Sequence, residues 1–120
     1  MITSMKTKIS TPLIAETRAF YERVFAMRVV EEWDEADDRG VILALDGGRT
    51  EALLEIYHRA TAADLSGVSL QFRVESVAAF RAALPSDIAC SEPTPRPWGA
   101  TYLYLTDPAG VAVIVYEGCW

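Results

Sequence analysis

Few side chains in this sequence carry the chemistry of a catalyst. His58 is the single histidine, and the two cysteines, Cys90 and Cys119, lack the spacing of a metal site. No nucleophile elbow and no glycine-rich phosphate loop occurs. A general base needs a partner and a pocket, and His58 precedes a polar segment, so we interpret it as a solvated histidine. We expect both thiols to be reduced, with Cys119 as the one that could react.

The acidic residues cluster between positions 31 and 38. The cluster consists of Glu31, Glu32, Asp34, Glu35, Asp37 and Asp38. Crowded like charges at a turn favour solvation and protect a sheet edge from pairing with another chain. Attraction of a cationic ligand is the functional alternative.

Aromatic side chains are the more suggestive set, namely Trp33, Tyr57, Trp98, Tyr102, Tyr104 and Tyr116. Rings with a few polar tips form a good surface for a flat or amphipathic ligand, although several could simply belong to a core. Strand alternation places Tyr57 on the face of Glu55, and Tyr116 on the face of Ile114. For Tyr102 and Tyr104 both alternatives stay open, because one face of their strand packs on a helix.

Composition and charge narrow the possible partners. The chain has 120 residues, 51% of them hydrophobic and 23% charged, which is ordinary for one soluble domain. A net charge of −6 and a pI near 4.7 disfavour nucleic acid and anionic membranes. No apolar run reaches the roughly 18 residues of a membrane span, and the first residues lack the apolar core of a signal peptide. We therefore expect a cytoplasmic protein.

The first half of the chain predicts a strand, a helix and three further strands. The first strand covers residues 6–11, and the helix begins at Thr11 and Pro12, with Thr11 as its cap. Helical spacing places one set of side chains on its inward face: Leu13, Thr17, Phe20, Tyr21 and Val24. The three remaining strands cover residues 27–33, 41–45 and 52–57, and residues 46–48 form a turn between the last two.

The second half repeats this order. A strand over residues 68–74 places Leu70, Phe72 and Val74 on one face, and Ser69, Gln71 and Arg73 on the other. Ser76 caps a short helix that Pro85 stops. Its inward side chains are Val77, Phe80 and Leu84. A weak strand at 88–90 and a proline-rich loop at 91–97 follow.

A hairpin closes the chain. Residues 102–105 alternate between aromatic and branched aliphatic side chains, which favours a strand. Asp107-Pro108-Ala109-Gly110 suits a type I turn. Residues 111–116 are almost continuously apolar, so we expect a strand that is buried on both faces.

Several of these segments resemble the vicinal oxygen chelate (glyoxalase/bleomycin resistance/dioxygenase) superfamily. The motifs are Phe20-Tyr21-Glu22-Arg23-Val24-Phe25, Leu54-Glu55-Ile56-Tyr57-His58, Trp98-Gly99-Ala100-Thr101 and Asp107-Pro108-Ala109-Gly110. The resemblance implies an α+β domain over residues 1–120, in which two tandem strand-helix-strand-strand-strand modules form a curved mixed sheet, or cup, with the helices outside. The modules would cover residues 5–58 and 67–118, with a connector at 58–66. Members often form dimers.

The resemblance also indicates where metal-dependent members hold their ion. The four ligand positions correspond here to Lys6, Glu55, Ser69 and Ile114. A lysine repels a divalent cation and an isoleucine has no lone pair, so we expect no metal and no cofactor. An unpaired carboxylate is costly in an apolar cup. We therefore expect Lys6, Lys8 or Arg73 to pair with Glu55, and the alternative is a Glu55 that is solvated at the cup mouth.

In these features the chain looks most similar to the metal-free bleomycin resistance branch. This implies a small-molecule-binding homodimer that sequesters an antibiotic or another cationic or aromatic ligand, without catalytic residues. One alternative is a lyase, isomerase or dioxygenase of the same superfamily, and another is a module that binds a peptide. The residues expected to line the ligand site are Lys6, Trp33, Glu55, Tyr57, Ser69, Arg73, Trp98, Tyr102, Ile114 and Tyr116.

Overall fold

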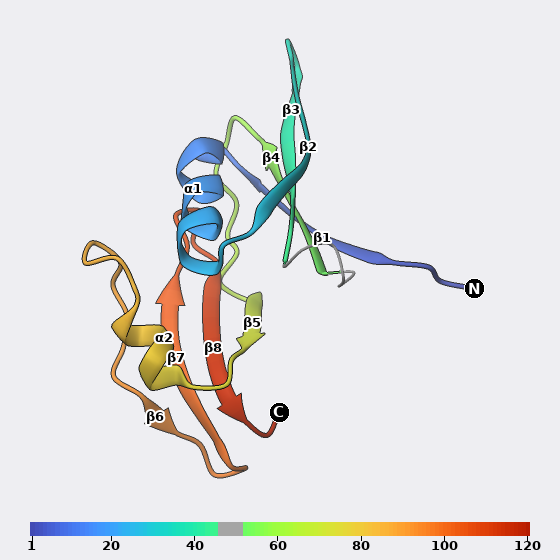
Figure 1. The fold of residues 1–120 in the computed structure, drawn as a ribbon. Helices are drawn as coiled ribbons and strands as arrows, with labels where there is room; N and C mark the ends of the chain where they lie inside the picture. Colours follow the sequence, from blue (N-terminus) through green and yellow to red (C-terminus); the bar gives the residue numbers. More distant parts are fainter. Residues whose placement is uncertain (46–51) are drawn as a thin grey trace. The chain divides into compact units, whose positions relative to one another are not determined.

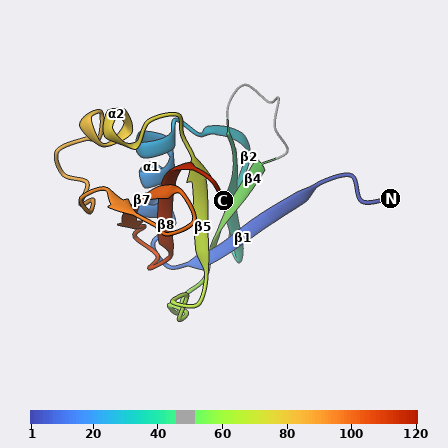
Figure 2. The same ribbon diagram turned by 90° about the horizontal axis from the view of Figure 1, so that it is seen from below.

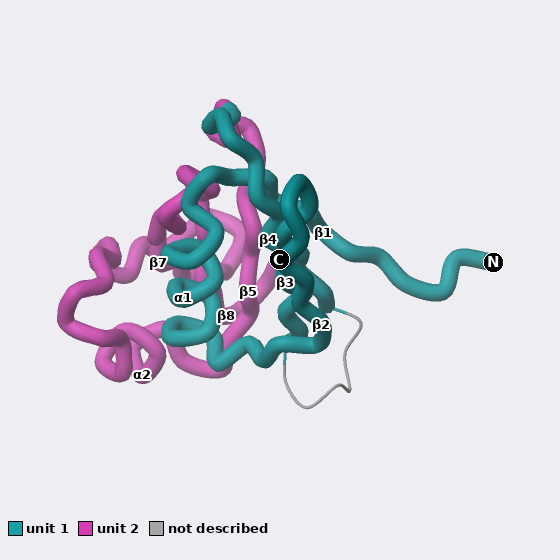
Figure 3. The backbone as a smooth tube through the Cα atoms, turned by 90° about the horizontal axis from the view of Figure 1, so that it is seen from above, with its two compact units in different colours: residues 1–63 teal, residues 64–120 magenta. Residues whose placement is uncertain are grey.

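The computed structural model describes residues 1–45 and 52–120. Two compact units divide the chain, residues 1–63 and residues 64–120, and Figure 3 colours them separately. Each unit contains one helix and one four-stranded mixed sheet. The α+β class and the tandem order of strand, helix and three strands are therefore confirmed. No helix among the described residues is long and apolar enough to cross a membrane.

The first unit follows the predicted order of elements (Figure 1). Its elements are β1 (Met5–Thr11), α1 (Ile14–Phe25), β2 (Arg28–Glu35), β3 (Asp38–Ala44) and β4 (Ala52–His58). The strand order is β1-β4-β3-β2, with β1 parallel to β4 and the other pairs antiparallel. The turn predicted at residues 46–48 lies outside the described residues.

Helix α1 starts later than the sequence predicts. Thr11 is the last residue of β1, where it pairs with His58, and Leu13 occupies the N-cap position without a side-chain hydrogen bond. The Thr11 hydroxyl accepts a hydrogen bond from the Leu13 N–H at 3.0 Å. A residue before proline favours extended backbone, and the parallel ladder holds Thr11 there. Leu13 is consequently 43% exposed and does not belong to the inward face.

The buried face of this sheet alternates along each strand. Ile9, Leu54, Ile56, Val41 and Leu43 are buried and share one face by register. The predicted helical residues Thr17, Phe20, Tyr21 and Val24 are also buried, and α1 contacts β4. The opposite face of the sheet carries Glu55 and Tyr57.

Helix α1 ends at Phe25, and the residue that caps its C-terminus is Ala26, a non-glycine residue with φ +52°. Left-handed backbone costs an L-residue about 1 kcal/mol that glycine avoids. Ala26 is exposed, so its methyl group contributes no packing. We expect Ala26→Gly to raise the free energy of unfolding in urea by about 1 kcal/mol. The matched control is Ala15→Gly at an exposed site in the first turn of α1, where the backbone is helical and glycine should lower stability.

The second unit repeats the topology. Its elements are β5 (Ser69–Arg73), α2 (Val77–Ala82), β6 (Thr94–Pro95), β7 (Ala100–Thr106) and β8 (Ala112–Gly118). The strand order is β5-β8-β7-β6, with β5 parallel to β8. Helix α2 contacts β7 and β8, and Figure 2 shows it above these strands. The Ser76 hydroxyl accepts a hydrogen bond from the Ala79 N–H at 3.1 Å, which confirms the predicted cap.

Two strand predictions in this unit are wrong. Residues 88–90 form no strand, because the Ile88 N–H donates to the Pro85 carbonyl in a turn, and β6 forms later in the proline-rich loop. Strand β8 is not buried on both faces. Val113 and Val115 are buried, whereas Ile114 and Tyr116 on the opposite face are half-buried.

The hairpin turn is confirmed. The Gly110 N–H donates to the Asp107 carbonyl at 3.0 Å, which is the hydrogen bond that closes a β-turn. The Asp107 carboxylate also accepts a hydrogen bond from the Val111 N–H at 2.9 Å. This turn fixes the register of β7 and β8, in which Tyr102 lies opposite Tyr116 and Tyr104 opposite Ile114.

Candidate functional site

Glu55 is a buried carboxylate in the middle of β4. Its residue exposure is only 6%, and its carboxylate forms an ion pair with the Lys6 ammonium at 2.6 Å. Lys8 lies at 3.9 Å from the other carboxylate oxygen. The expected pairing is therefore confirmed for Lys6, with Lys8 as a more distant second cation. Arg73 instead places its guanidinium 4.8 Å from the ring centroid of Trp120.

Tyr57 lies on the same face of the sheet as Glu55, as strand alternation predicts. The Lys8 ammonium lies 4.1 Å from the centroid of its ring. Across the sheet, Tyr57 and Trp33 both pair with Gly40. The Trp33 ring fills the space of a Gly40 side chain, since a Cβ there would lie 2.5 Å from the ring. The structure thus brings Trp33, Tyr57, Glu55 and Lys6 onto one face.

Asp38 connects the two aromatic residues of this face. The Trp33 indole N–H donates to its carboxylate at 2.8 Å, and Tyr57 forms a side-chain hydrogen bond with it. This hydrogen bond is the main reason why the pKa of Tyr57 lies above its ordinary value of 10.0, with desolvation and the charges of Asp38 and Glu55 adding to it. The sequence indicates only that Asp38 belongs to the acidic cluster, because Trp33 and Tyr57 both reach it only once β2, β3 and β4 are paired.

The raised pKa of Tyr57 predicts a pH dependence. The neutral phenol is favoured in the folded state, so its contribution to stability is complete below about pH 10 and is lost as the pH rises through the folded pKa. Phenolate absorbance, taken as the difference between the wild type and Tyr57→Phe, should show Tyr57 ionising above the ordinary value. In Asp38→Ala this pKa should fall. A Tyr57 that ionises at the same pH in both backgrounds would contradict the assigned hydrogen bond.

Other members of the acidic cluster also have specific partners. Arg18 of α1 forms ion pairs with Glu32 and, at 3.1 Å, with Glu22, and Arg39 lies 4.0 Å from Asp34. Partial burial lowers the pKa of Arg18, but the hydrogen bonds and charges of Glu32 and Glu22 outweigh it and hold that pKa above its ordinary value. The six carboxylates of the cluster are all exposed, as the solvated-turn interpretation expects, and one of them, Glu32, is closely paired with Arg18.

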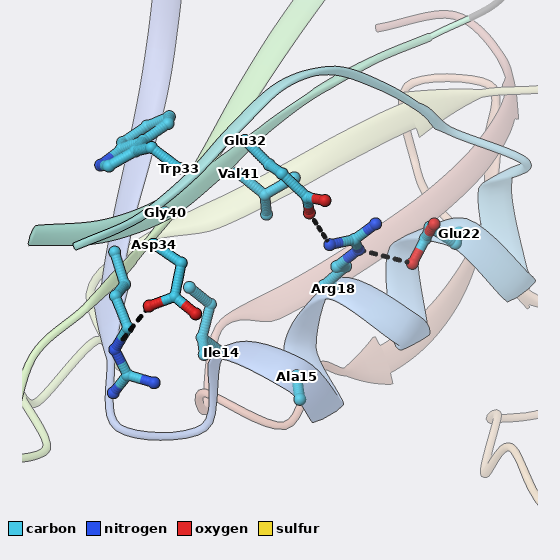
Figure 4. A pocket seen from close by; sticks show the side chains of 10 residues that line it. Ile14, Ala15, Arg18, Glu22, Glu32, Trp33, Asp34, Gly40 and Val41 are labelled. Carbon is cyan, nitrogen blue, oxygen red and sulfur yellow. Dashed lines mark hydrogen bonds and ion pairs between the residues drawn. The ribbon is translucent and has the colours of Figure 1, made fainter.

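These ion pairs border a pocket that the sequence analysis missed. Its volume is about 530 Å³, and residues of α1, β2 and β3 line it, including Ile14, Ala15 and Val41. Figure 4 shows Arg18 between Glu32 and Glu22 at one side of the pocket. Arg18 already has two carboxylate partners here, so its charge is not free to hold a ligand, whereas the side chains of Arg39 and Asp34 are exposed and lie 4.0 Å apart.

In the second unit, the predicted residues Ser69, Arg73, Ile114 and Tyr116 share one face of the sheet by register. Tyr102 and Tyr104 of β7 lie on this face too, opposite Tyr116 and Ile114 respectively. Helix α2 lies on the other face of the sheet, because the Val77 N–H at its start donates to Glu117, whose side chain points to the opposite side from Tyr116. Tyr102 and Tyr104 therefore lie on the face that does not pack on the helix. Ser69 is exposed, and its hydroxyl accepts a hydrogen bond from the Gln71 amide at 3.5 Å.

Aromatic rings on this face contact one another. Tyr102 is the centre of the group, with ring-centroid distances of 5.7 Å to Trp98, 5.8 Å to Tyr104 and 6.0 Å to Tyr116. The Arg96 guanidinium lies 5.0 Å from the Trp98 ring centroid and 5.9 Å from that of Tyr102. Sequence reasoning missed Arg96 and Trp120. The segment Pro95-Arg96-Pro97-Trp98 was the available signal for Arg96.

The remaining nucleophiles and metal ligands offer little. Burial raises the pKa of the partly buried Cys90 thiol, whereas Cys119 is exposed. His58 is half-buried at the end of β4. Among residues 1–45 and 52–120, no group of three or more His, Cys, Asp or Glu side chains could hold a metal ion.

Comparison with known families identifies the fold. Residues 6–115 match the model of the Glyoxalase/Bleomycin resistance protein/Dioxygenase superfamily. The chain belongs to this superfamily. The resemblance seen in its sequence motifs is thereby confirmed. A comparison with curated proteins found no match.

Solved structures share the superfamily fold at low sequence identity. TnmS3, an antibiotic binding protein from Streptomyces sp. CB03234, is 20% identical, with 99% of each chain covered and a TM-score of 0.75. The fosfomycin resistance protein FosX from Listeria monocytogenes is 12% identical, covers 99% of this chain and 96% of its own, and has a TM-score of 0.80. A bleomycin-binding protein complexed with bleomycin is 21% identical, with coverage of 98% and 100% and a TM-score of 0.67. These likenesses establish the fold alone.

Proposed function

We propose that this member of the superfamily is a metal-free protein that binds a small molecule, with antibiotic sequestration as its specific role. The observation that carries the proposal is the ion pair between Lys6 and Glu55 at 2.6 Å. The resemblance places a metal ligand at each of these two positions. Here Lys6, at one of these positions, neutralises the Glu55 carboxylate at the other.

The donor set does not fit a divalent ion. Such ions need several oxygen, nitrogen or sulfur ligands. The Lys6 ammonium repels a metal, Ile114 has no donor atom, and Ser69 offers only a hydroxyl. To bind a metal, Glu55 would have to give up its close contact with the Lys6 ammonium, and it would then be almost the only ligand of that metal. We therefore derive no chemical step through a metal.

Aromatic surface supports the binding part of the proposal. Each unit has a sheet face that carries exposed or half-buried rings beside polar groups, which is the usual chemistry of a small-molecule site. The structurally similar TnmS3 is an antibiotic binding protein, and another similar protein was solved with bleomycin. We extend this kind of ligand to the present chain. We also propose that residues 1–120 act as one domain in a cytoplasmic homodimer, which light scattering after gel filtration would test.

The deciding experiment is elemental analysis of protein purified without chelator, repeated after incubation with Zn²⁺, Ni²⁺, Mn²⁺ and Fe²⁺. We expect less than stoichiometric metal in every case. Glu55→Gln is the matched control, because it removes the only carboxylate among the four positions. Stoichiometric metal that disappears in this variant would overturn the proposal and make an enzyme the leading interpretation. His58→Asn and Cys119→Ser identify metal bound adventitiously elsewhere.

A further inference from the structure

The second unit carries a surface in which two guanidinium groups lie beside a group of aromatic rings. We call it the guanidinium–aromatic face and define it by Arg73, Arg96, Trp98, Tyr102, Tyr104 and Tyr116. Its members form a continuous row. Arg73 pairs in register with Tyr116, Tyr116 lies 6.0 Å from Tyr102, and Tyr102 lies 5.9 Å from the Arg96 guanidinium. Trp98 is 45% exposed and Tyr104 40%, so ring surface is available to a ligand.

The charge of this face is opposite to that of the whole protein. The chain has a net charge of −6, and residues 64–120 contain six acidic residues, which are Asp64, Glu75, Asp87, Glu92, Asp107 and Glu117. The strand positions on this face, which the register identifies, include none of them. Glu117 accepts a hydrogen bond from the start of α2 on the other face, and Glu92 pairs with Arg81 at 2.9 Å.

The two arginines of the face are not neutralised by the protein. Among the described residues, neither Arg73 nor Arg96 forms an ion pair with a carboxylate, whereas Arg81, the third arginine of this unit, does. The Nε atom of Arg96 is buried and has no hydrogen-bond acceptor among the described residues. Guanidinium groups stack on rings and pair with carboxylate or phosphate oxygens through parallel hydrogen bonds. Two arginines held on rings, with their charge unpaired, therefore favour an anion.

We propose that the ligand of the guanidinium–aromatic face is a planar aromatic molecule with an anionic group. The rings of Trp98 and the tyrosines stack with its aromatic part, and Arg96 or Arg73 pairs with its anionic group. This inference rests on the proposed small-molecule binding and specifies its chemistry. It reverses the cationic ligand that the acidic composition suggests, because the strand positions of this face carry no carboxylate.

The test compares three probes with the same ring system and different charge. They are pyrene-1-carboxylate, pyrene-1-carboxamide and pyrene-1-methylammonium, and their affinities are measured by quenching of tryptophan fluorescence. We expect the carboxylate to bind at least about tenfold more tightly than the ammonium, the scale of one charge-assisted interaction. The preference should weaken with added salt, because exposed charges are screened.

Variants locate the anion. Arg96→Gln or Arg73→Gln should weaken the carboxylate about tenfold while changing the carboxamide little. Arg81→Gln is the matched control, since it removes the same charge from an arginine that is already paired and not part of the face. Arg96→Lys keeps the charge and tests the stacked guanidinium even where the glutamine variant fails to fold. Weaker binding of the carboxylate probe in Arg96→Gln or in Arg73→Gln supports the proposal. Unchanged binding of that probe in both glutamine variants overturns it.

The outcomes separate this inference from the proposed function. Binding of the ammonium as tightly as the carboxylate overturns the anionic ligand and leaves small-molecule binding intact. A stoichiometric metal on Glu55 overturns the metal-free function and leaves the charge preference intact. Failure of all three probes to bind counts against both. A dimer that Trp98→Ala dissociates, with no effect on any probe, would assign the face to a second copy of this chain and overturn the proposal.

Discussion

Replacement of Gly118 by alanine is expected to destabilise the protein by about 3 kcal/mol or more. Gly118 is the last residue of β8 and has φ +90°. A Cβ at this position would lie 2.3 Å from the Gly99 carbonyl oxygen, and Gly99 belongs to the backbone that follows Trp98. Neither backbone segment can yield without breaking the pairing of Gly118 with Ala100. The free energy of unfolding in urea, measured for both proteins, tests this.

Gly110 provides a control with almost the same backbone. Its φ is +94°, but a Cβ there would meet no atom within 4 Å. Gly110→Ala should therefore cost only the strain of left-handed backbone, about 1 to 2 kcal/mol. The difference between the two variants isolates the overlap with the Gly99 carbonyl. Equal losses in both would show that the ends of β7 and β8 separate easily and that Trp98 is not held in place by this contact.

Features that depend on neighbouring residues were predictable from the sequence. The Ser76 cap and the Asp107 turn each rest on a hydrogen bond across three or four residues, so residue type and spacing determine them. Strand alternation also predicted correctly which side chains share one face of a sheet. It placed Glu55 with Tyr57 and Ile114 with Tyr116. The pairing of Lys6 with Glu55 was anticipated instead from the superfamily resemblance, which aligns both residues with ligand positions, and from the cost of an unpaired carboxylate.

Features that depend on distant partners were not predictable. Thr11 has the composition of a cap, but its pairing with His58 keeps it in β1. Asp38 bonds Trp33 and Tyr57 only because β2, β3 and β4 align at Gly40. The charge of the guanidinium–aromatic face could not be read from a net charge of −6, because the register decides which face each carboxylate occupies.

Removal of the Lys6 ammonium is expected to destabilise the protein by about 2 kcal/mol, because it leaves the Glu55 carboxylate without its close partner. The Glu55 side chain is only 8% exposed, so water replaces the ammonium poorly. Lys6→Met preserves the length of the side chain and removes the charge. The loss should stay below the roughly 3 to 5 kcal/mol of a fully isolated buried pair, because Lys8 remains 3.9 Å away. Chemical denaturation measures it.

The double variant Lys6→Met/Glu55→Gln decides whether the loss arises from the ion pair. A neutral pair contains no unpaired charge, so the double variant should recover most of the stability lost in Lys6→Met. Lys8→Met is the matched control, since Lys8 is half-exposed and more distant from the carboxylate, and it should cost less than Lys6→Met. If the stability losses of Lys6→Met and Glu55→Gln, measured separately, add up to the loss of the double variant, Lys6 and Glu55 are not coupled. The Glu55 carboxylate would then be free to bind another cation, including a metal ion.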